Sequence, residues 1–215
     1  MPFTSVLAHG SCAGVPCDDD DRELLPEERA FAASLAAVRR RDWIGGRVAL
    51  RRAAQSAGFA IAAAILSDDR GAPRLPSGLV GSVSHKDGVA VALVARSDGW
   101  TVGIDLERTT ARRLDITNRV LRLAERVALE VLDGAERARA LMLRFSLKEA
   151  VYKAIDPHLR RYVGLQEVAV WPDVAGTARV EMFCPDGAAL LVEGAWIERD
   201  GLWLTTAQAK HLDTQ

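Results

Sequence analysis

The order of the expected secondary-structure elements constrains the fold of this chain most. Residues 26–57 are rich in Ala, Leu, Glu and Arg and predict helix, broken at Gly45–Gly46 and ended by Gly58. The short apolar runs that follow, LVGSVS, VAVALVA and TVGIDLE, are separated by KDG and RSDG and predict strands joined by turns. A small antiparallel meander is the simplest arrangement for these strands.

The second half of the chain repeats this order. Helix is expected at about residues 116–132 and 135–155, followed by the strand-like runs QEVAVW, ARVEMF, LLVEGAWIE and LWLTTAQA. Helices followed by strands, twice, predict an α+β fold of two similar lobes in a pseudo-twofold arrangement, each a small antiparallel sheet packed with helices. We place the lobes at residues 1–107 and 108–215, although no residue-level repeat relates them.

Composition excludes several classes of protein. The chain has 215 residues, of which 49% are hydrophobic and 27% charged, and its net charge of −1 gives no global basic field for nucleic acid. It shows neither a secretory signal nor an apolar run long enough for a membrane span. Cys12, Cys17 and Cys184 are odd in number and lack CxxC spacing, which favours a reducing cytoplasm. A zinc site at His9, Cys12 and Cys17 is a less favoured alternative.

Two carboxylates stand two residues apart in the run GIDLE at residues 103–107. Because residues i and i+2 of a strand project to the same side, Asp105 and Glu107 would share one face. Like charges so close need a cation or solvent, and hard oxygen ligands at this spacing suit Mg²⁺. The alternative interpretation is a solvated strand end that runs into a loop.

The run FSLKEAVYKA at residues 145–154 places Glu149 and Lys153 four residues apart, on one face of a helix. Such a pair is most often a surface ion pair worth a few tenths of a kcal/mol. If the helix instead faces the Asp105 and Glu107 strand, Glu149 becomes a third metal ligand or a general base. Lys153 then becomes a cation for a phosphate leaving group.

Side chains suited to phosphate occur earlier in the chain. Ser84 and His85 end the SVSH run, where a hydroxyl and an imidazole can bind phosphate or form a polar strand end. Arg47 and Arg51 stand four residues apart on the expected helix, and Arg70 lies in the turn-like DRGAP. Arginine suits the fork geometry of phosphate, although most arginines at such spacing are solvated.

In their order and residues, these motifs together resemble those of the bacterial phosphopantetheinyl transferases of the Sfp type, including the siderophore-synthase branch. That family shows an arginine-bearing helix, a K/R-G-x-P loop, a serine/threonine-histidine strand end, a GxD-x-E strand and a W/F-S-x-K-E-A-x-x-K helix. The chain has GRVALR, DRGAP, SVSH, GIDLE and FSLKEAVYKA in that order, followed by RYVGLQEV at residues 161–168. The likeness covers most of the chain, and its last two motifs are the specific part. Phe145 stands where tryptophan is common, and Arg70 where lysine is common.

The resemblance implies a monomer with coenzyme A in the cleft between two α+β lobes. It implies transfer of 4′-phosphopantetheine from coenzyme A to a serine of an apo carrier protein, with release of adenosine 3′,5′-bisphosphate. By carry-over, Asp105, Glu107 and Glu149 would hold Mg²⁺, with Mn²⁺ as the alternative ion. Glu149, or a metal-bound water, would be the general base, and Lys153, with Lys148 nearby, would stabilise the leaving nucleotide.

The same resemblance assigns the remaining contacts. The phosphates of coenzyme A would be bound by Arg47, Arg51, Arg70, Ser84 and His85. An acidic helix of the carrier would meet an arginine-rich segment that comprises Arg112, Arg113, Arg119, Arg122 and Arg126. Neither nucleic acid nor a membrane is an expected partner.

The choice of carrier stays open among fatty-acid, polyketide and nonribosomal-peptide synthases. One alternative function is a non-catalytic module that binds coenzyme A or a carrier, which the three carboxylates and Lys153 disfavour. A metal-dependent phosphodiesterase or nucleotidyl transferase would use a second cluster of carboxylates and histidines, and the sequence offers none.

Overall fold

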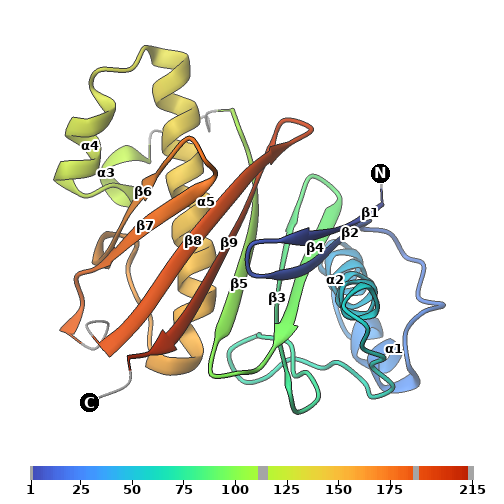
Figure 1. Cartoon of the computed structure of the whole chain (residues 1–215). Coiled ribbons are helices and arrows are strands. Elements are labelled where there is room, and N and C mark those ends of the chain that lie inside the picture. Colours follow the sequence, from blue (N-terminus) through green and yellow to red (C-terminus); the bar gives the residue numbers. More distant parts are fainter. Residues whose placement is uncertain (1, 111–115, 186–188, 213–215) are drawn as a thin grey trace. The chain divides into compact units, whose positions relative to one another are not determined.

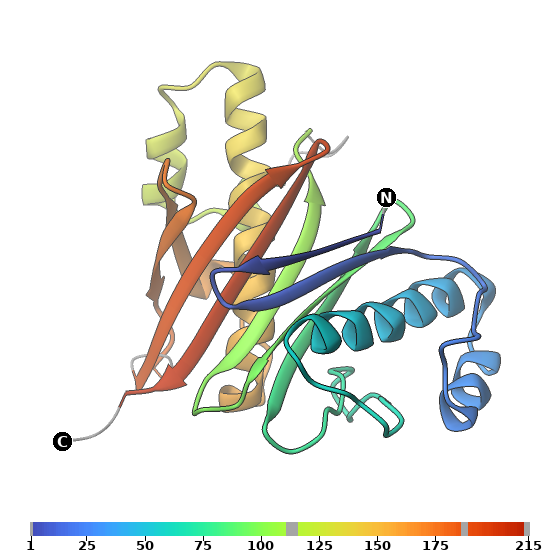
Figure 2. The same ribbon diagram turned by 45° about the vertical axis from the view of Figure 1, so that its right-hand side comes forward.

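In a computed structural model, which describes residues 2–110, 116–185 and 189–212, the chain divides into two compact units, Met1–Val102 and Gly103–Gln215. Each unit is an antiparallel sheet packed with helices, so the predicted α+β class is confirmed (Figures 1 and 2). The division falls shortly before the proposed lobe border, so that Asp105 and Glu107 belong to the second unit. No helix in the described part of the chain is long and apolar enough to span a membrane.

The first unit is a four-stranded sheet in the order β1-β2-β4-β3, with α2 packed on it. Figure 2 shows α2 lying along this sheet. The β1-β2 hairpin was not expected, because residues 3–16 consist largely of small side chains and carry little of the β-branched signal. The elements are β1 (Phe3–Leu7), β2 (Gly10–Pro16), α1 (Pro26–Ala33), α2 (Ala37–Ser56), β3 (Leu79–Lys86) and β4 (Val89–Arg96).

The predicted helix break at Gly45–Gly46 is wrong, because the break lies at residues 34–36, between α1 and α2. Both glycines are buried inside α2, where this helix meets the sheet. A Cβ atom on Gly45 would lie 3.0 Å from the Cβ of Ala90, and one on Gly46 would lie 2.9 Å from Cγ1 of Val83. The glycines therefore permit a close approach of helix and sheet that outweighs their low helix propensity.

The second unit is a five-stranded sheet in the order β5-β9-β8-β7-β6, with α5 packed on β8 and β9 (Figure 1). The predicted meander is therefore wrong in its third strand, because β5 pairs with β9 and not with β4. The elements are β5 (Thr101–Arg108), α3 (Thr117–Val120), α4 (Leu123–Leu129), α5 (Gly134–Leu159), the 3₁₀ helix η1 (Leu165–Glu167), β6 (Val168–Pro172), β7 (Thr177–Met182), β8 (Leu190–Arg199) and β9 (Leu202–His211).

Helix α5 is the central element of the second unit. It begins where the Asp133 side chain accepts a hydrogen bond from the backbone N–H of Glu136 at 2.8 Å, a typical N-cap. It ends at Arg160, which has the left-handed φ of 48°. The short helices α3 and α4 pack beside α5 through a small apolar cluster that includes Val120, Leu121 and Leu129.

Candidate active site

Strand β5 presents both predicted carboxylates on one side. The alternation of the strand places Asp105 and Glu107 together, and they are only 7% and 4% exposed. Gly103, two residues earlier, lies against α5, where a Cβ atom would be 2.8 Å from the backbone nitrogen of Ala154. The missing side chain therefore brings the strand close to the turn of α5 that carries Glu149 and Lys153. A solvated strand end is excluded.

The helix FSLKEAVYKA does face this strand. Lys153 Nζ donates hydrogen bonds to Asp105 Oδ1 at 2.9 Å and to the backbone oxygen of Ile104 at 2.8 Å. Ser146 Oγ donates to Asp105 Oδ2 at 2.9 Å and lies 2.9 Å from Thr205 Oγ1. Asp105 is thus held by two residues of α5, and Lys153 forms its ion pair across to the strand.

Glu149 lies at a pocket of about 460 Å³ in the second unit. Aromatic and apolar side chains form much of its wall, and the polar ones include Arg119 and Gln166. In the described part of the chain no three His, Cys, Asp or Glu side chains gather into a metal-binding group, so the triad of Asp105, Glu107 and Glu149 stays a prediction. The pocket is lined by Ile116, Arg119, Val120, Phe145, Glu149, Tyr152, Tyr162, Val163, Gly164, Leu165 and Gln166.

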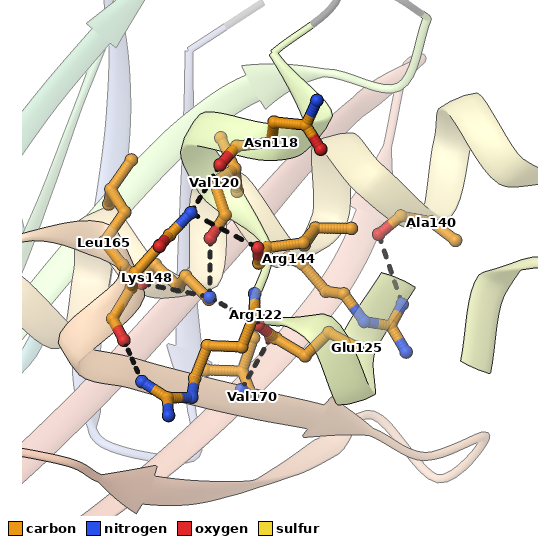
Figure 3. Close-up of polar contacts among 11 residues, drawn as sticks. Asn118, Val120, Arg122, Glu125, Ala140, Arg144, Lys148, Leu165 and Val170 are labelled. Carbon is orange, nitrogen blue, oxygen red and sulfur yellow. Dashed lines mark hydrogen bonds and ion pairs between the residues drawn. The ribbon is translucent and has the colours of Figure 1, made fainter. Parts of the chain in front are cut away.

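Lys148 occupies a different position from the one predicted. Its side chain is fully buried, and its ammonium donates to Glu125 Oε2 at 2.6 Å, to the Val120 carbonyl at 2.7 Å and to the Leu165 carbonyl at 3.0 Å (Figure 3). Desolvation lowers the pKa of Lys148, and the carboxylate of Glu125 opposes this shift. We therefore withdraw Lys148 as a coenzyme A contact, because its ammonium has no surface from which to meet a phosphate.

The arginines of α2 are also engaged within their own unit. Arg47 is 4% exposed and donates to the Ile65 carbonyl at 2.8 Å and to Ser67 Oγ at 2.7 Å. Burial lowers the pKa of Arg47 to about 10. Arg51 forms an ion pair with the buried Glu28 at 2.9 Å. We withdraw Arg47 as a phosphate contact for the same reason as Lys148, whereas the side chain of Arg51 keeps 16% of its surface exposed.

Of the other phosphate candidates of the first unit, Arg70 and His85 lie nearer the surface, whereas Ser84 is buried. Arg70 is exposed in the loop between α2 and β3, Ser84 is 7% exposed, and the side chain of His85 is 54% exposed. His85 Nδ1 lies 3.4 Å from Asp42 Oδ2. Burial, followed by the charge of Asp42, raises the pKa of the nearby Cys17 thiol to about 12. No motif surrounds Asp42 in α2, so its place beside His85 was not predictable from the sequence.

The predicted arginine surface is only partly described. Arg112 and Arg113 lie outside the described residues, and Arg119, Arg122 and Arg126 do not share one helix face, because the chain turns between α3 and α4. Arg119 is exposed. Arg122 donates to the Gln166 carbonyl, and its guanidinium lies 3.6 Å from the ring centroid of Phe183. Arg126 donates to Asn118 Oδ1 at 2.6 Å.

The sequence did not predict the aromatic residues of the pocket wall or the buried glutamate that pairs with Lys148. Tyr152 and Tyr162 have ring centroids 6.2 Å apart, and both line the pocket. Tyr162 belongs to the run RYVGLQEV, which the sequence offers as part of the family resemblance. The run does not reveal that this tyrosine lines a pocket. Glu125 is 0% exposed, and nothing in its surroundings in the sequence marks it as buried.

Comparison with known proteins matches both halves of the chain to models of one enzyme family. Residues 27–95 match the 4′-phosphopantetheinyl transferase N-terminal domain, and residues 101–207 match the 4′-phosphopantetheinyl transferase superfamily. The 4′-phosphopantetheinyl transferase Npt of Nocardia iowensis is 33% identical over 86% of this chain and 89% of its own length. PptT of Mycobacterium tuberculosis is 32% identical over 84% of each chain, and Svp of Streptomyces mobaraensis is 34% identical over 95% of this chain and 85% of its own.

Proposed function

The chain belongs to the Sfp-type 4′-phosphopantetheinyl transferases, which transfer phosphopantetheine from coenzyme A to carrier proteins, and we propose that Asp105, Glu107, Glu149 and Lys153 carry out this transfer. One observation supports the assignment most. The Lys153–Asp105 ion pair joins the two specific motifs at 2.9 Å, beside a second buried carboxylate. Buried charges are costly unless they are paired or hold a cation, so this cluster has the properties of a functional site.

A divalent cation fits the chemistry of this donor set. Asp105 and Glu107 supply hard carboxylate oxygens on one side of a strand, which suit Mg²⁺, and Mn²⁺ is accepted by similar ligands. Glu149 would complete the ligand set, directly or through water. When bound, the ion would neutralise the pyrophosphate of coenzyme A, where negative charge grows during transfer.

The side chains of the second unit can then divide the reaction between them. The serine hydroxyl of the carrier attacks the β-phosphorus of coenzyme A, so that a new P–O bond forms as the pyrophosphate P–O bond breaks. Glu149 accepts the proton that the hydroxyl loses. Lys153 would supply the cation that stabilises the departing adenosine 3′,5′-bisphosphate, and its bond to Asp105 supports this role by fixing the position of the ammonium.

The pocket beside Glu149 suits the pantetheine arm. Pantetheine is an uncharged chain with apolar and amide groups, and the pocket combines aromatic and apolar walls with the polar side chains of Arg119, Glu149 and Gln166. Arg51, Arg70, Ser84 and His85 of the first unit are the proposed contacts for the phosphates at the nucleotide end.

The carrier would meet the second unit at α3 and α4. Arg119 is exposed there, and Leu123 and Val127 of α4 are 67% and 52% exposed. A carrier helix with an acidic face would complement the charge of Arg119. The pathway that the carrier serves is left open by these contacts.

Intact mass of an apo carrier protein, after incubation with the enzyme, coenzyme A and Mg²⁺, tests the proposal. We expect the carrier to gain the mass of phosphopantetheine, and a chelator to abolish the gain. Glu149→Gln should lower the rate by about 10²-fold or more, the contribution typical of general acid–base catalysis. Glu136→Gln changes an exposed glutamate of the same helix and is the matched control. Binding of coenzyme A without any gain of mass on carriers of several pathways would favour the non-catalytic module.

A further inference from the structure

Lys148 carries a buried charge on α5 that the proposed chemistry does not use. Its side chain and that of Glu125 are both 0% exposed. An ammonium has three N–H donors and no acceptor, and the three acceptors around Lys148 are Glu125, Val120 and Leu165. The lysine is therefore committed to the interior of the second unit.

Glu125 extends this cluster to further segments. Its Oε1 accepts the backbone N–H of Val170 at 3.0 Å, and its Oε2 accepts the backbone N–H of Arg122 at 2.9 Å. Figure 3 shows Val170 bonded to the Glu125 carboxylate, which in turn accepts a bond from the Lys148 ammonium. The Lys148–Glu125 pair thus connects α5 with the end of α3, the first turn of α4, the start of η1 and strand β6.

Two of these connections end at the wall of the pocket. Val120 and Leu165 both line it, and both give their carbonyl oxygens to Lys148. The next residue of α5, Glu149, lies at the same pocket. One ammonium therefore holds two separate parts of the wall in place relative to the helix that carries the proposed base.

Stability alone does not account for a lysine in this position. Replacing a buried ion pair by apolar side chains of similar volume is often neutral or stabilising. An apolar side chain, however, would leave the Val120 and Leu165 carbonyls without this donor. Arginine would not be equivalent, since its planar fork is larger and the space around Lys148 is fully enclosed.

We propose that Lys148, paired with Glu125, is a positioning residue that sets the spacing of Val120 and Leu165 so that the pocket accepts the pantetheine arm beside Glu149. The inference rests on the proposed function, because it takes the occupant of the pocket to be pantetheine. It predicts a selective defect. Loss of the ammonium should weaken binding of coenzyme A and spare binding of its nucleotide end, which does not enter the pocket.

Titration of the purified enzyme with coenzyme A and with adenosine 3′,5′-bisphosphate, both with Mg²⁺, tests this selectivity. For Lys148→Met we expect the Kd for coenzyme A to rise about tenfold or more, and the Kd for the nucleotide to stay within about twofold. Glu125→Gln keeps an acceptor for the ammonium and should preserve the preference for coenzyme A. Glu198→Gln, which removes the exposed Arg139–Glu198 pair of the same unit, is the matched control.

Each outcome decides the matter. Unchanged Kd values for Lys148→Met, or an equal rise for both ligands, would overturn the positioning role, because general loosening does not discriminate between them. If Lys148→Met does not fold, Lys148→Met/Glu125→Gln carries no buried charge at these positions and is measured in its place. If the wild-type enzyme binds the nucleotide as tightly as coenzyme A, the pantetheine pocket itself is wrong. Transfer to the carrier, measured by mass, reports separately on the proposed function.

Discussion

The two compact units each contain a buried glutamate with the same local role. Glu28 in the first unit and Glu125 in the second are both 0% exposed, and each is the third residue of a short helix. Each accepts a hydrogen bond from the backbone N–H that precedes its helix, Leu25 at 2.8 Å and Arg122 at 2.9 Å. The glutamate thus satisfies a donor that a helix start leaves without a partner.

The long-range bonds of the two glutamates also correspond. Each accepts a backbone N–H from a distant segment, Ile65 at 2.6 Å and Val170 at 3.0 Å. Each pairs with a cation of its unit's long helix, Arg51 at 2.9 Å and Lys148 at 2.6 Å. The sequence has no residue-level repeat from which this correspondence could have been predicted.

The clusters differ in what their cations hold. In the first unit, Arg51 and Arg47 bind the Ala63 and Ile65 carbonyls and so fix the segment that leads to the exposed Arg70. In the second unit, Lys148 binds the wall of the pocket. A motif cation can therefore serve ligand binding indirectly, by fixing the residues that make the contact.

The largest expected effect comes from breaking the second cluster. Glu125→Ala leaves the Lys148 ammonium buried without its counter-ion, and we expect the free energy of unfolding to fall by about 3–5 kcal/mol. Chemical denaturation measures this loss, with Glu198→Ala as a surface control. A loss no larger than that of the control would show that the pair does not support the unit.

Breaking the first cluster should cost less. Glu28→Ala removes the acceptor of two backbone N–H groups, but Arg51 keeps 16% of its side chain exposed and can be hydrated. We expect a loss of about 2–3 kcal/mol, from donors left unsatisfied. Hydrogen exchange should rise first in residues 57–78, and protection that is unchanged there would contradict the role of this cluster.

A third variant distinguishes a residue that contacts the ligand from one that stabilises the fold. Arg70→Ala should weaken binding of adenosine 3′,5′-bisphosphate about tenfold, or 1.4 kcal/mol, because it removes a proposed phosphate contact. Its exposure predicts an unchanged unfolding midpoint. Calorimetric titration and thermal unfolding together check this, and Arg74→Ala, in the same loop, is the control. Equal effects of the two variants would remove Arg70 from the site.

The smallest effect concerns pH at the far end of α5. Desolvation lowers the pKa of His158, so between its folded pKa and 6.5 the unfolded chain binds more protons than the folded one. Stability should therefore rise with pH through this window and fall as the pH drops below 6.5. His158→Gln should flatten this dependence by up to about 1 kcal/mol, measured by denaturation at several pH values. An unchanged slope would show that His158 does not contribute.

Local patterns predicted most of the regular elements. The runs QEVAVW, ARVEMF, LLVEGAWIE and LWLTTAQA, which were predicted to be strands, overlap β6, β7, β8 and β9, and the expected helix at residues 135–155 lies within α5. Pairing was not predictable in the same way. Strand β5 follows β4 directly in the chain but lies beside β9, because sheet neighbours are chosen by long-range packing.

The motifs that carry the chemistry, their order and the shared strand face of Asp105 and Glu107 can be read from the sequence, because side-chain identity and strand alternation are local properties. The burial of a charge cannot be read in this way. In the sequence, Lys148 and Arg47 cannot be told from any surface cation, although both are buried. Their partners lie in segments far along the chain, and only folding brings those segments together.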